Sequence, residues 1–272
     1  MPELPEVETV RRQLAPFLVG ERIDDVVLRR GDLRAPFPAD FAARLTGATV
    51  LELHRRAKHL LADLSSGETL LMHLGMSGEF RVEQGGERLP VGKHDHVIVQ
   101  LGSGAVVTFT DPRRFGSMDL VPTDGLAEHP VIGALGPEPL SASFTPAVLA
   151  RACRGRKTAI KVALLDQRIV AGLGNIYVVE ALYRAGLSPF RRASILATPT
   201  GAPRDAARRL VPQIKKVLVE AIERASNANY RGGRFRVYDR EGKPCLRPRC
   251  PGVIRRRTQA GRSTFSCPIC QR

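Results

Sequence analysis

Three observations predict a multidomain α+β protein. Short segments rich in Val, Leu and Thr, separated by glycine turns, fill the chain from Gly20 to about Leu120 and predict strands. Longer segments with helical spacing of apolar residues dominate from Pro146 to Ala225. Four of the five cysteines fall between residues 245 and 270, which is typical of a small metal-bound unit. We therefore expect an N-terminal β-sandwich with a flanking N-terminal helix, a helical domain and a C-terminal metal-bound β-hairpin.

Turn signals divide each half into elements. The expected strands are residues 22–28, 48–53, 60–64, 69–74, 79–82, 96–101 and 105–110. The expected helices after the first are residues 39–45, 146–153, 157–165, 175–184 and 203–225. A stretch rich in Gly, Pro and Ser indicates a linker. The resulting division is an N-terminal domain 1–132, a linker 133–146, a helical domain 147–232 and a terminal unit 233–272.

The first residues combine a helix start with a reactive group. Apolar residues at Val7, Val10, Leu14 and Phe17 predict a helix from about Pro5, which Pro16 should end or kink. Removal of Met1, common before a small residue, would give Pro2 a secondary amine. An α-amino group has a pKa of about 8, so it can act as a nucleophile near neutral pH. Glu3 could then transfer protons at the same carbon, although most N-termini are frayed and inert and a Glu near a helix start is usually a capping charge.

The charge of the chain is concentrated in its second half. Residues 1–150 hold 15 Lys and Arg against 20 Asp and Glu, whereas residues 151–272 hold 27 against 7. A half-chain this basic indicates a polyanionic partner, with nucleic acid as the simplest choice. Charge alone leaves ribosomal RNA and acidic membrane surfaces open. The sequence has no 18-residue apolar run and no secretion signal, so we expect a soluble cytoplasmic protein without a membrane partner.

Three turns combine cations with apolar side chains. Residues 55–59 place three cations at a strand edge, where phosphates could be held. Met76 lies in a glycine-rich turn, and Arg113 and Phe115 lie in another. Exposed apolar side chains beside arginine can enter a base stack, but core Met and Phe beside solvated Arg would give the same pattern. A further turn, Gly172–Asn175, could approach a phosphate at a helix N-terminus.

The four clustered cysteines have the spacing of a metal site. Cys245 and Cys250 form a C-x4-C pair, and Cys267 and Cys270 form a C-x2-C pair. Two such pairs about 17 residues apart can reach one tetrahedral zinc ion from two turns. The segments between them, 253–257 and 262–265, are expected to form a hairpin rich in arginine. So small a unit has almost no core, so the metal would supply much of its folding free energy.

Together these motifs resemble the bacterial formamidopyrimidine-DNA glycosylases, relatives of endonuclease VIII. The resemblance runs nearly from end to end and rests on residues 2–9, 55–58, 73–78, 93–96, 111–116, 135–140, 157–161, 174–177 and the cysteine segment with 261–265. Leu4 matches this branch, because endonuclease VIII has glycine there. The implied protein is a bifunctional DNA glycosylase and abasic-site lyase. Its partner would be duplex DNA that contains oxidised purines or abasic sites.

The resemblance also implies roles for single residues. Pro2 would form a Schiff base at C1′, Glu3 would move protons, Lys58 would serve β-elimination and Arg262 δ-elimination. The implied DNA contacts are His94, Arg113, Lys157 and Asn175, with Met76, Arg113 and Phe115 filling the gap left by the flipped base. The helical domain would contain a helix–two-turn–helix, one zinc ion would be structural, and no cofactor would do the chemistry. The implied protein is a monomer at the bacterial nucleoid.

Two departures from the family pattern limit what can be carried over. The first cysteine pair is C-x4-C where the family has C-x2-C, which puts the metal geometry in question. The segment 226–234 replaces a longer loop that caps the flipped base in the family. We therefore hypothesise weaker discrimination for 8-oxoguanine over formamidopyrimidines. Two other readings stay open: a non-catalytic zinc-finger DNA-binding protein, and an RNA-binding protein of the ribosome.

Overall fold

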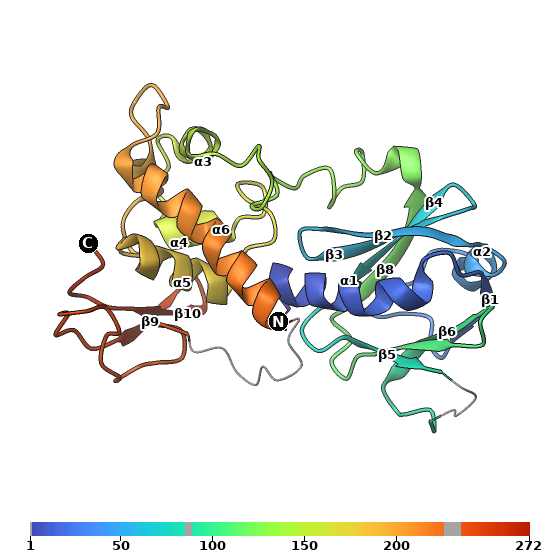
Figure 1. Ribbon diagram of the computed structural model, residues 1–272. Helices are drawn as coiled ribbons and strands as arrows, with labels where there is room; N and C mark the ends of the chain where they lie inside the picture. Colours follow the sequence, from blue (N-terminus) through green and yellow to red (C-terminus); the bar gives the residue numbers. More distant parts are fainter. Residues whose placement is uncertain (1, 85–88, 226–234) are drawn as a thin grey trace. The chain divides into compact units, whose positions relative to one another are not determined.

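The chain folds into two compact units, Met1–Gly133 and Ala134–Arg272, called here the N-terminal and C-terminal units. Figure 1 shows the computed structural model, which describes residues 2–84, 89–225 and 235–272. Within these residues, no helix combines the length and apolar character that crossing a membrane requires. The segment 226–234, where the sequence predicts a shortened loop, lies outside the described residues.

Two antiparallel four-stranded sheets make up most of the part of the N-terminal unit that the structure describes. The first has the order β1-β6-β7-β5, with β1 Ile23–Leu28, β6 Asp95–Leu101, β7 Val106–Thr110 and β5 Glu79–Glu83. The second has the order β2-β3-β4-β8, with β2 Val50–Arg56, β3 His59–Leu64, β4 Glu68–His73 and β8 Ser117–Pro122. A short 3-10 helix, η1 (Thr123–Gly125), follows β8.

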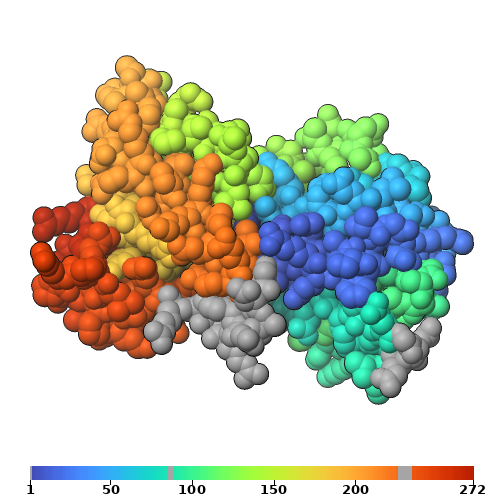
Figure 2. Space-filling view, viewed as in Figure 1, coloured from blue at the N-terminus to red at the C-terminus, as the bar shows by residue number. Residues whose placement is uncertain are grey.

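One apolar core joins the two sheets, as a β-sandwich requires. It contains inward-facing residues from both sheets and from the helices α1 (Leu4–Leu18) and α2 (Phe41–Leu45). α1 packs against β2, β3 and β5, and carries Val7, Leu14 and Leu18 into this core. Its opposite face lies at the surface, as the blue atoms in Figure 2 show. The predicted sandwich with a flanking helix is confirmed.

Two details differ from the prediction. α1 runs through Pro16 to Leu18 without ending there. Pro16 lies in the last turn, so its missing N–H interrupts the helix only near the end, and the Val19 N–H still bonds the Ala15 carbonyl at 3.1 Å. β8 was not among the predicted strands. Its inward residues are only Met118 and Leu120, too short a run to stand out.

Over its described residues, 134–225 and 235–272, the C-terminal unit contains four α-helices and a hairpin. The helices are α3 Pro146–Cys153, α4 Ile160–Leu165, α5 Asn175–Ala185 and α6 Asp205–Ala225, with a 3-10 turn η2 at Ala193–Leu196. The hairpin pairs β9 (Arg255–Gln259) with β10 (Arg262–Ser266). α6 packs against α3 and α5, and β10 packs against α5. α4 begins three residues later than predicted, after Ala159.

α5 also supports the segment that leads to the cysteines. Its Val179 and Tyr183 share an apolar cluster with Val237, Cys245, Ile254, Phe265 and Cys267. Its Glu180 is 3% exposed and accepts backbone N–H groups from Arg236 at 3.0 Å, Val237 at 2.8 Å and Tyr238 at 2.9 Å. A carboxylate that receives several N–H groups is well solvated by the protein itself. The segment that follows residue 234 is therefore attached to α5 by both apolar and polar contacts.

Candidate functional site

Pro2 directly precedes a fixed helix start. Glu3 is the N-cap of α1 and is 3% exposed. Its backbone N–H donates to the Glu6 carboxylate at 2.9 Å, one half of a capping box, and its carbonyl accepts from the Val7 N–H at 3.1 Å. Pro5 in the first turn adds a fixed φ. Glu3 is therefore both a helix cap and a buried carboxyl group next to Pro2.

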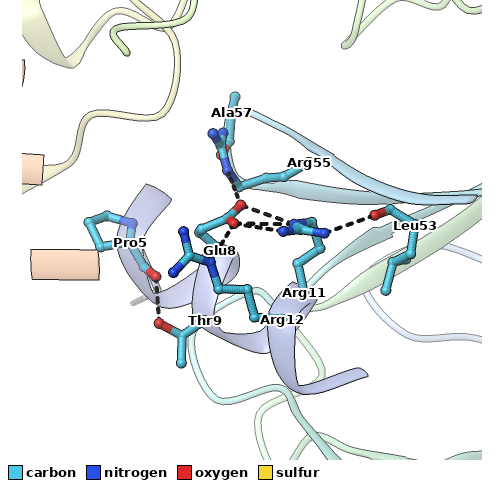
Figure 3. Close-up of polar contacts among 8 residues, drawn as sticks. All are labelled: Pro5, Glu8, Thr9, Arg11, Arg12, Leu53, Arg55 and Ala57. Carbon is cyan, nitrogen blue, oxygen red and sulfur yellow. Dashed lines mark hydrogen bonds and ion pairs between the residues drawn. The ribbon is translucent and has the colours of Figure 1, made fainter. Parts of the chain in front are cut away.

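The Glu8 carboxylate binds α1 to the sheet, as Figure 3 shows. It accepts from Arg11 Nη2 at 2.9 Å and Arg12 Nε at 2.9 Å on the helix, and from Arg55 Nε at 3.3 Å on β2. Burial raises the pKa of Glu8, but hydrogen bonds from Arg11 and Arg12 and the charges of Arg11 and Arg55 outweigh it, so the net pKa is lowered. The carboxylate therefore stays ionised at neutral pH.

Arg55 also contacts the turn that carries Lys58. Arg56 and His59 are paired, so Ala57 and Lys58 form a two-residue hairpin turn between β2 and β3. Ala57 has a left-handed φ of 55°, and its carbonyl accepts from Arg55 Nη1 at 3.0 Å. Lys58 is 8% exposed. The Arg55 side chain therefore points to Glu8 and to the Ala57 carbonyl, and its role is to position Lys58 and not to provide an exposed charge.

Two neutral histidines lie near Lys58. His59 on β3 is paired with His73 on β4, and their ring centres are 4.9 Å apart. Burial is the main cause that lowers the pKa of His59 to about 3 and that of His73 to about 4, and the charge of Lys58 acts in the same direction on both. Both rings are therefore uncharged at physiological pH, and neither adds to the positive charge around Lys58.

Met76 and Phe115 are exposed, which excludes the alternative that they belong to the core. Their exposed fractions are 41% and 42%. The Arg113 guanidinium lies 4.8 Å from the centre of the Phe115 ring, in cation–π contact. The structure therefore presents Met76, Arg113 and Phe115, which the resemblance predicts to fill the gap left by a flipped base, on two neighbouring loops. These loops, 75–78 and 111–116, are called here the wedge loops.

Asp111 holds the wedge loops together. It is fully buried, and its carboxylate accepts from Ser77 Oγ at 2.6 Å and from the Gly116 N–H at 2.8 Å. Its own N–H donates to the His94 carbonyl at 3.0 Å, which places His94 beside these loops. A Cβ on Gly75, whose φ is 64°, would come within 2.3 Å of the Phe115 backbone. Only glycine permits this approach.

In the C-terminal unit, Arg262 and Asn175 are brought together. Arg262 begins β10 after the Ala260–Gly261 turn and is exposed. The carbonyl of the next residue, Ser263, accepts from Asn175 Nδ2 at 3.0 Å and from Lys161 Nζ at 3.0 Å. Asn175 is the first residue of α5, so the N-terminal end of that helix adjoins the hairpin.

Lys161 is a functional candidate that the sequence did not single out. It is fully buried, and it also donates to Thr264 Oγ1 at 2.7 Å. Burial, and then the charge of Arg262, lower the pKa of Lys161 to about 8. The available signal was one lysine in an otherwise apolar short helix, Ile160–Leu165. Lys157, by contrast, lies exposed in the turn before α4.

Glycine and glutamine shape the turn between α4 and α5. Gly172 has a φ of 82°, and its N–H donates to Gln167 Oε1 at 2.9 Å. The Gln167 amide in turn donates to the carbonyls of Leu165 at 3.0 Å and Leu173 at 2.9 Å. One glutamine side chain therefore replaces the missing backbone partners of this turn.

The four cysteines converge as a metal centre would require. All four Sγ atoms lie within 4.8 Å of one another. Cys245 and Cys270 are 3.7 Å apart, and Cys250 and Cys267 are 3.6 Å apart. A tetrahedral ion with metal–sulfur bonds of about 2.3 Å places its sulfurs about 3.8 Å apart, whereas a disulfide requires about 2.05 Å. The C-x4-C spacing thus fits a tetrahedral ion.

The Glu8 network yields a prediction with an internal control. Arg55 and Arg12 bind the same carboxylate, but their side chains are 11% and 49% exposed. We expect Arg55→Ala to destabilise the protein by about 1–3 kcal/mol, because it removes one partner from a buried network. Arg12→Ala should cost less than about 1 kcal/mol. Thermal unfolding compares the two, and a larger loss with Arg12→Ala would contradict the assignment.

Comparison with known proteins agrees with this geometry. Residues 1–118 match the model of the formamidopyrimidine-DNA glycosylase N-terminal domain, and residues 135–230 match that of the formamidopyrimidine-DNA glycosylase H2TH domain. The formamidopyrimidine-DNA glycosylase of Afipia carboxidovorans is 55% identical over 295 residues, with 100% of both chains covered. That of Bradyrhizobium sp. BTAi1 is 56% identical over 294 residues, again with 100% of both covered.

Solved structures give the same result. The MutM (Fpg) protein of Thermus thermophilus has a TM-score of 0.83 and 40% identity, covering 99% of this chain and 98% of that one. The Fpg of Lactococcus lactis, in a complex with DNA that contains a FAPY-dG lesion, has a TM-score of 0.86 and 31% identity, covering 99% and 100%. Taken with the residues described above, these matches show that the chain belongs to the formamidopyrimidine-DNA glycosylase family.

Proposed function

We propose that this protein is a bifunctional DNA glycosylase and abasic-site lyase that removes oxidised purines, formamidopyrimidines and 8-oxoguanine, from duplex DNA. The observation that carries the proposal is Pro2 directly ahead of a fixed helix start with a buried Glu3 beside it. A secondary amine can only come from a terminal proline, so removal of Met1 is part of the proposal. Related structures hold DNA with FAPY-dG or carbocyclic 8-oxo-G, which supports the substrate class.

The chemistry begins with bond exchange at C1′. The Pro2 nitrogen bonds to C1′ as the bond from C1′ to the base breaks, and the base leaves with a proton. Glu3 moves protons as the base departs and the sugar ring opens to an iminium ion. The iminium acidifies the 2′ hydrogens, so loss of one of them cleaves the 3′ C–O bond. A second elimination cleaves the 5′ side. Lys58 serves the first elimination and Arg262 the second.

The wedge loops and the cations of both units would hold the DNA. Met76, Arg113 and Phe115 are exposed on loops that Asp111 fixes, so they are suited to fill the space left by a flipped base. His94, Lys157 and Asn175 are proposed phosphate contacts. The excess of cations after residue 150 supports a polyanionic partner. The proposed location is the bacterial nucleoid.

We propose one zinc ion for the cysteine centre. Thiolates favour zinc among the ions of a reducing cytoplasm, and Cys245, Cys250, Cys267 and Cys270 have tetrahedral spacing. When bound, the ion would stabilise the fold and supply no step of the reaction. Residues 233–272 are then the zinc finger, and residues 147–232 the helical DNA-binding domain, after a linker at 133–146 and a catalytic domain at 1–132.

Chemical trapping tests Pro2 as the nucleophile. Borohydride reduction of the protein on a duplex with one 8-oxoguanine opposite cytosine should give a covalent complex, because the iminium ion is reducible. Pro2→Leu should give none, because a large second residue keeps Met1 in place. Intact mass establishes whether Met1 is absent from the wild type and present in the variant.

The same experiment on an abasic duplex separates the competing functions. Trapping there but not on the lesion would leave the lyase and refute the substrate. Trapping on neither duplex, with Met1 absent, would favour a non-catalytic DNA-binding protein. Binding of structured RNA in preference to either duplex would favour the ribosomal alternative.

Substitution of Arg262 tests its role in δ-elimination. Arg262→Ala should leave base release and β-elimination intact but slow δ-elimination by about 10²-fold, the usual size of a proton-transfer contribution. Products that end in a phosphate should give way to unsaturated aldehydes on a sequencing gel. Arg255→Ala removes one exposed cation from the same hairpin and is the control. An equal effect of both variants would reduce Arg262 to a phosphate contact.

The choice between 8-oxoguanine and formamidopyrimidine can also be tested. Alignment with the Afipia relative extends over 295 positions, more than the 272 residues of this chain, so the relative carries residues that this chain lacks. The sequence suggests that a lesion-capping loop at 226–234 is the shortened part. We expect comparable single-turnover excision of 8-oxoguanine and formamidopyrimidine from matched duplexes. A strong preference for 8-oxoguanine would refute the hypothesis.

A further inference from the structure

The four residues between Cys245 and Cys250 have a structural partner in α5. The side chain of Arg247 reaches the last turn of that helix, where its Nη2 donates to the Tyr183 carbonyl at 2.6 Å. The same carbonyl also accepts the backbone N–H of Gly186 at 3.0 Å, so Arg247 is its second donor, and the cation opposes the negative end of the helix dipole. The Arg247 guanidinium lies 5.3 Å from the centre of the Tyr183 ring. Arg247 therefore caps α5 and stacks on its side.

The same tyrosine contacts a predicted metal ligand. Tyr183 is 2% exposed, and its hydroxyl lies 3.2 Å from Cys245 Sγ. The backbone N–H of Arg247 approaches the same sulfur at 3.5 Å. A metal-bound cysteine is a thiolate, which can only accept, so the phenol must donate. Tyr183 is thus joined to the first cysteine pair through its hydroxyl, its ring and its carbonyl.

These contacts matter because of the charge that the site would hold. One divalent ion and four thiolates carry a net charge of about −2, and Cys245 and Cys267 are buried. A buried charge is costly unless nearby donors solvate it. The Tyr183 hydroxyl and the Arg247 N–H are such donors, and the Arg247 guanidinium is a cation on the same turn.

We propose that Tyr183 is an outer-shell positioning residue of the cysteine centre and that, with Arg247, it makes retention of the metal depend on α5. The inference rests on the proposed zinc ion but not on the proposed DNA chemistry. It gives the longer C-x4-C turn a role, since the inserted residues bring Arg247 to the end of the helix. The metal and the helical part of the C-terminal unit then stabilise each other.

Tyr183→Phe is the decisive variant. It keeps the ring, its place in the apolar cluster and the surface on which Arg247 stacks, and it removes only the donor. Loss of an outer-shell partner typically reduces metal affinity by 10- to 100-fold. We therefore expect zinc to leave the full-length Tyr183→Phe protein at least about 10-fold faster than the wild type when a chromogenic chelator is in excess.

Arg247→Ala and Arg249→Ala form a matched pair. Each removes one cation from the same turn, but Arg249 is exposed and the structure shows no hydrogen bond from its side chain within the described residues. We expect faster zinc release from Arg247→Ala and the wild-type rate from Arg249→Ala. If Arg247→Ala does not fold, Arg247→Lys keeps the charge but loses the planar guanidinium, and it should also release zinc faster.

A spectroscopic readout separates an outer-shell donor from simple packing. In the cobalt-substituted protein, Tyr183→Phe should shift the sulfur-to-cobalt charge-transfer band, because the donor no longer withdraws charge from the thiolate. A wild-type release rate together with an unshifted band would overturn the inference. Wild-type protein that contains no zinc by elemental analysis would instead refute the proposed zinc ion, and the two failures are therefore distinguishable.

Discussion

The N-terminal unit depends on an ion network around one carboxylate. A chain terminus is usually the least ordered part of a protein, and a nucleophile there needs a rigid support. Glu8 supplies it by binding two arginines of its own helix and Arg55 of β2. Because Arg55 also holds the Ala57 carbonyl, the support of Pro2 and the turn of Lys58 share a partner. The placement of two proposed catalytic residues thus rests on contacts that do not touch the reacting atoms.

In the C-terminal unit, the buried Lys161 holds the hairpin that carries Arg262. Arg262 is at the tip of a two-stranded hairpin, an element that has little stability of its own. Lys161 and Asn175 both donate to the residue after it, so the hairpin takes its position from the helices. Burying an ammonium group is costly, and the lowered pKa of Lys161 reflects that cost. Its hydrogen bonds to Ser263 and Thr264 offset part of it.

Local pattern predicted most elements because each has a strong period or a clear turn signal. α1, the strands up to Thr110 and the cysteine centre follow from apolar spacing, glycines and cysteine pairs. The contacts that organise the site are not local. Lys161 meets Ser263 across 102 residues, and Ser77 meets Asp111 across 34. Periodicity carries no information about such pairs, so their partners could not be read from either segment alone.

The proposed function rests on a different kind of signal. Pro2 and Glu3 are adjacent in sequence, so their combination is visible without a fold, and the resemblance gave them roles. Met76 and Phe115 were ambiguous, because exposed and core side chains look alike in a sequence. Only the structure, in which both are about two-fifths exposed, separated the two readings.

The rigid wedge loops have a consequence for the free protein. Asp111 and the close approach of Gly75 to Phe115 fix the backbone of the loops that carry Met76 and Phe115, and both side chains are about two-fifths exposed. Their exposed apolar surface therefore stays in contact with water until a ligand covers it. Covering this surface stabilises the complex by about 25 cal/mol per Å². Covering it releases no counterions, unlike a phosphate contact. A basic protein of this kind consequently retains a part of its affinity for a polyanion that salt does not weaken.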